Sequence, residues 1–181
     1  MSGRLFVVLG PSGAGKDTLI AGAVARRPEL LWARRVVTRP EAAGGEPYEG
    51  VSREEFERRR SAGLFAVWWE AHGLLYGAPA TIGDEMEAGR DVILNGSRGA
   101  VGQARLVFPH LKVIYVTAPE AVLARRLAAR GRESEAEIAR RLARAAFPPP
   151  KDAVVVQNDG SVEEGVSRLL AALTPPMRNA G

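Results

Sequence analysis

The feature that most constrains the fold of this 181-residue chain is the segment Gly10-Pro11-Ser12-Gly13-Ala14-Gly15-Lys16. It matches the pattern G-x-x-x-x-G-K, follows a strand-like apolar run at residues 5–9, and opens a helical pattern at residues 17–26. The glycines let successive backbone N–H groups converge on phosphate oxygens, and the helix N-terminus adds a favourable dipole. The segment therefore predicts a P-loop that binds ATP, with Lys16 reaching the β- and γ-phosphates.

The residue after the P-loop lysine departs from this pattern. Ser or Thr normally supplies a hydroxyl to magnesium here, whereas this chain has Asp17 followed by Thr18. A carboxylate is a good hard-oxygen ligand for Mg²⁺, although it adds negative charge near the triphosphate. We expect Asp17 to contact Mg²⁺ directly or through water, and Thr18 to help hold the phosphates.

A second cluster of basic residues predicts a lid. Arg126 and Arg130 are four residues apart, so they share one helix face. Gly131 ends that helix, and the following helix carries Arg141 back toward the first two arginines. We expect a lid over residues 130–141 that closes Arg130 and Arg141 over the transferring phosphoryl group, with Arg126 at the ATP. The alternative is a solvated basic helix face.

The remaining pattern alternates strands and helices, which predicts an α/β fold of the P-loop NTPase class, a parallel sheet covered by helices on both faces. Strands are expected at 34–38, 64–69, 74–76, 91–94, 111–117 and 153–156, and helices at 17–26, 53–62, 119–129, 135–146 and 162–173, with further helices on either side of 91–94. Residues 41–50 read as a loop. Because residues 34–80 break the alternation, we expect one domain over 1–181 with an inserted subdomain there. The loop after the last strand places Asn158 and Asp159 where an adenine could rest.

Composition excludes several classes of protein. The chain has no cysteine, and its two histidines, His72 and His110, are too far apart in sequence to suggest a zinc site. No apolar run approaches the roughly 18 residues of a membrane helix, and the start lacks a signal peptide, so we expect a cytoplasmic protein. The net charge is +4, without a basic stripe interleaved with aromatic residues. Small-molecule partners are therefore expected, rather than nucleic acid or membrane.

Several motifs together resemble the guanylate kinase family over nearly the whole chain. They are, in chain order, the P-loop, Thr38-Arg39-Pro40, Val51-Ser52-Arg53-Glu54-Glu55-Phe56, Tyr76-Gly77, the lid and Asn158-Asp159. The resemblance implies a guanylate-kinase-like fold whose insertion at 34–80 binds the phosphoryl acceptor. It also implies that Arg39 and Tyr48 bind the acceptor phosphate, with Tyr76 close by.

The positions that read a guanine base in guanylate kinases are changed in this chain. Val67 stands where that family has glutamate, and Ala78 stands where it has Ser or Thr. The acidic segment after the third core strand is replaced by Asn95-Gly96-Ser97-Arg98. A site that recognises a base through hydrogen bonds loses its discrimination between acceptors when the hydrogen-bonding side chains are replaced. The added cation Arg98 suits an acceptor with a second phosphate in place of a purine.

This combination resembles the ribose 1,5-bisphosphate phosphokinases, which act in bacterial phosphonate breakdown. That resemblance rests on four segments: Gly15-Lys16-Asp17-Thr18, residues 36–40 together with 44–46, residues 69–74 and residues 95–98. It implies ATP-dependent phosphorylation of ribose 1,5-bisphosphate at its 1-phosphate, giving 5-phospho-α-D-ribose 1-diphosphate, with Asn95 and Arg98 in the acceptor site. His72 either faces the acceptor or only stabilises a hairpin turn. A guanylate kinase, a kinase for another sugar phosphate and a non-catalytic interaction module are the alternatives.

Overall fold

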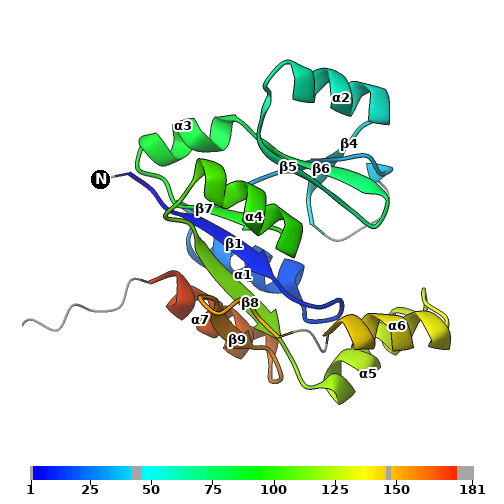
Figure 1. Ribbon diagram of the computed structural model, residues 1–181. Helices are drawn as coiled ribbons and strands as arrows, with labels where there is room; N and C mark the ends of the chain where they lie inside the picture. The colour runs from blue at the N-terminus through cyan, green and yellow to red at the C-terminus, as the bar shows by residue number, and fades with distance from the viewer. Residues whose placement is uncertain (1, 42–45, 146–147, 175–181) are drawn as a thin grey trace, which may run out of the picture. The chain divides into compact units, whose positions relative to one another are not determined.

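The computed structural model describes residues 2–41, 46–145 and 148–174 (Figure 1). The chain forms two compact units, one made of Met1–Leu9 with Arg27–Val113 and the other of Gly10–Arg26 with Ile114–Gly181. The P-loop, the predicted lid and the loop after the last strand belong to the second unit. All six predicted acceptor residues belong to the first.

Three strands of the first unit form a parallel ladder. Strand β7 (Val92–Asn95) pairs in parallel with β1 (Leu5–Leu9) and with the short β2 (Leu31–Trp32). Every residue of β1 and β7 is buried, as their apolar sequences predict. The sequence did not indicate β2, which has only two residues.

The first unit also contains a four-stranded sheet in the order β4-β3-β6-β5. Strands β5 (Phe65–Ala71) and β6 (Leu74–Pro79) form the predicted hairpin, which turns at His72 and Gly73, both with positive φ. Strand β3 (Arg35–Val37) pairs with β6 in antiparallel fashion. The prediction of a loop over residues 41–50 was wrong for its last part, because β4 (Tyr48–Gly50) pairs in parallel with β3.

Helix α2 (Arg53–Ser61) covers part of this sheet. Its N-cap Ser52 accepts a hydrogen bond from the Glu55 backbone N–H, and serine is one of the residues favoured at that position. Phe56 is fully buried against a core cluster that includes Val36 and Leu75, and its ring stacks on Phe65 at 4.6 Å. The apolar face of α2 therefore fixes the helix on β3, β5 and β6. Helices α3 (Thr81–Glu87) and α4 (Arg98–Val107) flank β7 in the chain.

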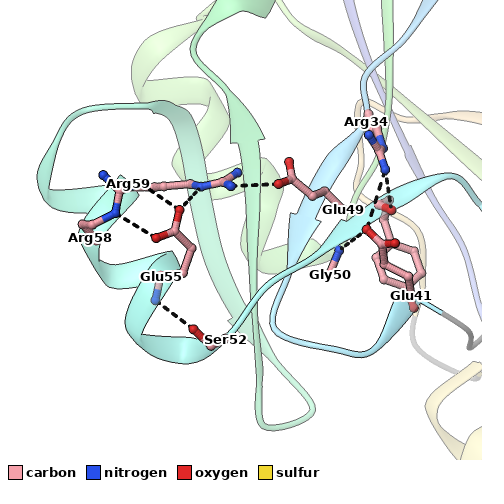
Figure 2. A network of polar contacts seen from close by, with 9 residues as sticks. Arg34, Glu41, Glu49, Gly50, Ser52, Glu55, Arg58 and Arg59 are labelled. Atoms are coloured by element: carbon pink, nitrogen blue, oxygen red, sulfur yellow. Dashed lines mark hydrogen bonds and ion pairs between the residues drawn. The ribbon is translucent and has the colours of Figure 1, made fainter.

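A polar network ties α2 to β4, as Figure 2 shows. Arg59 donates to Glu55 at 2.7 Å and to Glu49 on β4 at 2.8 Å. Arg58 also donates to both carboxylate oxygens of Glu55 at 2.8 Å. Hydrogen bonds from Arg58 and then Arg59 lower the pKa of Glu55 to about 2. The network anchors the strand that carries Tyr48.

The second unit contains two helices that pack against each other, α1 (Lys16–Arg26) and α7 (Val162–Leu173). Gly22 of α1 lies so close to Val166 that a Cβ there would overlap the valine side chain. Ser161 and Glu164 form a capping box at the start of α7, which explains why this helix has the predicted bounds. Strands β8 (Lys112–Thr117) and β9 (Val154–Gln157) pair in parallel.

The predicted lid region forms a helical hairpin. Helix α5 (Glu120–Arg130) ends at Gly131, whose φ of 60° is left-handed, and α6 (Glu135–Ala145) packs against it (Figure 1). The predicted break at Gly131 is confirmed, and the last residue of the predicted helix 135–146 lies outside the described residues. Across the described ranges, no helix combines the length and the apolar character needed to cross a membrane.

Candidate active site

The P-loop follows β1 in the chain and runs into α1. Gly13 and Gly15 both have φ of 86°, a region that a residue with a side chain rarely adopts, and this accounts for glycine at both positions. Lys16 Nζ donates to the Gly10 carbonyl at 2.7 Å and to the Pro11 carbonyl at 3.3 Å. The ammonium group is thereby held over the loop by two carbonyl oxygens, which are the kind of partner that phosphate oxygens can replace.

A clamp of two side chains holds the centre of the P-loop. Asn158 Nδ2 donates to the Ala14 carbonyl at 2.7 Å, and a Cβ on Gly15 would lie only 2.6 Å from the same nitrogen. Arg126 donates to the Gly13 carbonyl at 3.3 Å, to the Ala14 carbonyl at 3.4 Å and to the Asn158 carbonyl at 2.7 Å. In a trans peptide the carbonyl and the next N–H point in opposite directions. The clamp therefore turns the Gly15 N–H away from Asn158.

The sequence predicted that Arg126 and Asn158 contact ATP, and the structure places both side chains on the P-loop backbone. Asn158 is buried, with 6% of its surface exposed. Asp159 is exposed and pairs with Arg168 at 2.9 Å, and the hydrogen bond from Arg168 lowers the pKa of its carboxyl. Sequence reasoning did not single out Arg168, which also donates to the Gln157 carbonyl at 2.7 Å and so braces this loop.

A cavity of about 290 Å³ lies beside the P-loop within the second unit. Its lining brings together six residues that the sequence assigned to the donor site: Gly13, Gly15, Thr18, Arg126, Arg130 and Asn158. Arg130 is exposed at the end of α5. Arg141 on α6 pairs with Glu133 at 3.3 Å and is not part of the lining. The cavity is close to the lower size limit of a small-molecule site.

Asp17 is half-exposed in the first turn of α1, where a carboxylate is favoured by the helix dipole. Within the described ranges, no three His, Asp or Glu side chains gather as a group that could hold a metal ion. Mg²⁺ is commonly bound by one or two carboxylates together with substrate phosphates. The donor set around the P-loop fits such an ion, with Asp17 as the carboxylate nearest to Lys16 in the chain.

In the first unit, Arg39 and Tyr48 contact each other. The Arg39 guanidinium lies 4.5 Å from the centre of the Tyr48 ring, and its Nε donates to the Tyr48 hydroxyl at 3.2 Å. That hydroxyl also donates to the Pro40 carbonyl. Tyr48 is 5% exposed and Arg39 is half-buried, so this cation is held in place by a buried ring.

The other predicted tyrosine, Tyr76, stacks on Trp69 with the rings 5.5 Å apart and nearly parallel. The guanidinium of Arg35 lies 4.9 Å from the Tyr76 ring and 5.9 Å from the Trp69 ring, and Arg35 pairs with Glu46. Sequence reasoning assigned no site role to Arg35 or Glu46. The available signal for Arg35 was a charged residue at the start of β3, ahead of two valines.

The two positions that read guanine in guanylate kinases face each other in this chain. Val67 and Ala78 are direct partners in the β5–β6 ladder, and they are 3% and 0% exposed. Neither side chain carries a hydrogen-bonding group. This part of the sheet therefore offers apolar contact alone.

The remaining predicted acceptor residues lie elsewhere in the first unit. Asn95 ends β7 and is 6% exposed, whereas Arg98 is the exposed first residue of α4, after the N-cap Ser97. His72 is exposed in the hairpin turn with φ of 53°. Arg98 places a cation at a helix N-terminus, where an anion is the favourable partner.

Comparison with known proteins defines the class. A family model described as guanylate kinase matches residues 2–174. A crystal structure of guanylate kinase from Anaplasma phagocytophilum covers 95% of this chain and 85% of that chain, with a TM-score of 0.67 and 22% identity. A gluconokinase from Sinorhizobium meliloti covers 95% and 91%, with a TM-score of 0.54 and 19% identity. The predicted P-loop kinase fold is confirmed, and the chain belongs to the guanylate kinase family.

Relatives with higher sequence identity show to which part of the family the chain is most similar. Ribose 1,5-bisphosphate phosphokinase PhnN of Rhizobium etli is 47% identical over 94% of this chain and 89% of its own length. The protein of that name from Acidiphilium cryptum is 49% identical over 95% and 93%. A bifunctional ribose 1,5-bisphosphokinase-thymidine phosphorylase of Cupriavidus necator is 47% identical over 99% of this chain, which spans only 30% of that relative's length. Within the family, the chain falls among the relatives named PhnN, as its motifs predicted.

Proposed function

We propose that this chain transfers the γ-phosphoryl group of ATP to the 1-phosphate of ribose 1,5-bisphosphate, giving 5-phospho-α-D-ribose 1-diphosphate. The observation that carries the proposal is the facing pair Val67 and Ala78, which leaves no hydrogen-bonding group where a purine would be read. The names of the relatives that the chain covers almost end to end support the same acceptor. Without such partners, the site no longer selects a guanine base by hydrogen bonding.

The donor half of the site is the P-loop with its clamp. Lys16 would exchange the Gly10 and Pro11 carbonyls for phosphate oxygens, while the Gly15 N–H is already turned away from the clamp. Mg²⁺, held by Asp17 and the phosphates, would neutralise charge on the triphosphate. Thr18, Arg126, Asn158 and Asp159 complete the donor site in this proposal.

The acceptor half belongs to the stretch 34–80, together with Asn95 and Arg98. In the proposal, Arg39, Tyr48 and Tyr76 bind one acceptor phosphate and Arg98 binds the other, while His72 lies beside the sugar. The attacking oxygen belongs to a phosphate and is anionic at neutral pH, so the reaction needs no strong general base. Catalysis then consists of alignment and charge neutralisation.

The lid over residues 130–141 would supply the remaining cations. Arg130 and Arg141 would close over the transferring phosphoryl group and exclude water. Arg141, whose side chain is 37% exposed, would leave Glu133, whose side chain is 9% exposed. Because this carboxylate is mostly buried, losing its partner costs more than breaking an exposed ion pair, and the phosphate contacts of Arg141 would have to offset that cost.

The proposal is tested by measuring ADP release with ATP, Mg²⁺ and one of three acceptors: ribose 1,5-bisphosphate, ribose 5-phosphate or GMP. We expect turnover with ribose 1,5-bisphosphate and little with the other two. Turnover of GMP alone would make the chain a guanylate kinase. Absence of both ATP binding and turnover would instead support the interaction module. Lys16→Ala serves as the inactive control, because it removes the phosphate-binding ammonium group.

A further inference from the structure

The four-stranded sheet brings four side chains into one row across β4, β3, β6 and β5. Arg35 is the direct partner of Tyr48 in the parallel β3–β4 ladder. In the antiparallel β3–β6 ladder Val36 faces Gly77 and Val37 faces Tyr76, so the register places Arg35 beside Ala78. Ala78 faces Val67 in turn. Directly paired residues share a face of a sheet, so one row holds Tyr48, Arg35, Ala78 and Val67.

Arg35 is the charged member of this row, and it is buried. Arg35 is 9% exposed and its partner Glu46 is 5% exposed. Across the described part of the chain, the other buried polar residues are Asn95 and Asn158, so this is the one ion pair with both members buried. A buried ion pair often stabilises a fold no better than apolar residues of similar volume. Its presence beside two tyrosines of the acceptor site therefore suggests a role beyond folding.

The contacts of Arg35 show which group it controls. Its guanidinium lies 4.9 Å from the centre of the Tyr76 ring and 5.9 Å from that of Trp69, and these two rings stack on each other 5.5 Å apart. Tyr76 is 8% exposed, so its ring has little freedom once both neighbours are in place. A cation over an aromatic face contributes about 0.5–2 kcal/mol, more when water is excluded.

We propose that Arg35, held by Glu46, is a positioning residue that fixes Tyr76 for the acceptor phosphate. The inference rests on the proposed function, which places Tyr76 in the acceptor site. Arg35 acts through the ring of Tyr76 and the ladder neighbour Tyr48, and Glu46 balances its charge inside the sheet. Loss of Arg35 therefore weakens acceptor binding and leaves the ATP site, which lies in the other unit, unchanged.

The experiment is a double-mutant cycle with steady-state kinetics. Arg35→Met keeps the length of the side chain and removes its charge, Tyr76→Phe removes the hydroxyl, and the third variant carries both changes. We expect each single change to raise the KM for the acceptor about tenfold, because the loss of one polar contact costs roughly 1.4 kcal/mol. The KM for ATP should stay unchanged. The double variant should be no worse than the more impaired single one, since both act on the same hydroxyl.

The matched control is Arg60→Met. Arg60 also lies over an aromatic ring, that of Trp68 at 4.6 Å, but its side chain is 39% exposed. This variant should leave both KM values unchanged. If Arg35→Met does not fold, Arg35→Lys retains the charge that pairs with Glu46 and loses the planar stacking, and we expect an intermediate acceptor KM from it.

Either of two results with the variants would overturn the inference. Arg35 variants that lower thermal stability while both KM values stay at wild-type levels would show a purely structural role. Independent, multiplicative effects of Arg35→Met and Tyr76→Phe would show that Arg35 does not act through Tyr76. If the wild type prefers another phosphorylated acceptor, the proposed function fails, and the cycle is run with that acceptor. If no acceptor is turned over, the positioning role falls as well.

Discussion

The hydrogen bond from Asn158 to the Ala14 carbonyl gives a sharp test of how the P-loop is held. The nitrogen and oxygen lie 2.7 Å apart, and Asn158 is 6% exposed. Asn158→Ala removes one buried hydrogen bond, for which about 1 kcal/mol is a central value. If the clamped loop is the conformation that binds phosphates, that loss appears as weaker nucleotide binding, by roughly fivefold.

Asn158→Asp is the more informative change, because it preserves shape and replaces the donor with a carboxylate oxygen. Two acceptors would then face each other where Asn158 Nδ2 now meets the Ala14 carbonyl. An unsatisfied, repelling buried contact costs about 2 kcal/mol or more, which corresponds to a loss of roughly 30-fold in ADP affinity. Isothermal titration with ADP measures this value, and urea unfolding reports separately on the stability of the fold.

Glu163→Gln is the matched control, since Glu163 is exposed in the first turn of α7 just after the same loop. It should bind ADP as the wild type does. The clamp would be refuted if Asn158→Asp bound ADP normally while Asn158→Ala did not. That pattern would mean that an oxygen at this position accepts from the nucleotide itself, as expected for an adenine contact.

Lys16→Ala should abolish turnover while its circular dichroism spectrum stays that of the wild type, and near-normal turnover would contradict the donor site. Arg58 and Arg59 hold the pKa of Glu55 at about 2, below its ordinary 4.5, so its stabilising effect is complete above 4.5 and disappears as the pH falls toward 2. Glu55→Gln should therefore have a lower urea midpoint than the wild type at pH 7, with the difference shrinking at pH 3; an unchanged difference would count against the network. Ser161→Ala removes the capping box of α7 and should cost about 1 kcal/mol, or roughly 3 °C in Tm by calorimetry, whereas an unaltered Tm would show that packing alone sets this helix.

Local features of the chain were predictable because their causes are local. Glycine at positions 13 and 15 signalled the positive φ angles of the P-loop, and Gly131 signalled the end of α5. Ser52, followed by Glu55, marked the start of α2. In each case the signal and the structure it dictates lie within a few residues of each other.

Features that depend on distant partners were not predictable in the same way. The clamp joins Asn158 to Ala14, and these residues are 144 positions apart. Strand β4 has only three residues and is defined by its pairing with β3, so no alternation of residue types could reveal it. Arg35 and Glu46 likewise stand out only because they are buried, with Arg35 beside Tyr76 and Trp69. A single sequence does not show this burial.

The same distinction explains why the acceptor was easier to infer from missing groups than from present ones. Val67 and Ala78 are informative because apolar residues cannot read a base, wherever the sheet places them. Their direct pairing in the β5–β6 ladder strengthens that inference, since the two losses affect one spot. The cations expected to replace the base contacts depend on the arrangement of whole elements.

Phosphorus NMR of the product formed from ATP and ribose 1,5-bisphosphate shows whether the acceptor group is a phosphate. We expect a sugar diphosphate, seen as two coupled phosphorus signals, beside one unchanged phosphate monoester. A product with three uncoupled monoester signals would mean that a sugar hydroxyl was phosphorylated, and the acceptor group would then not be a phosphate.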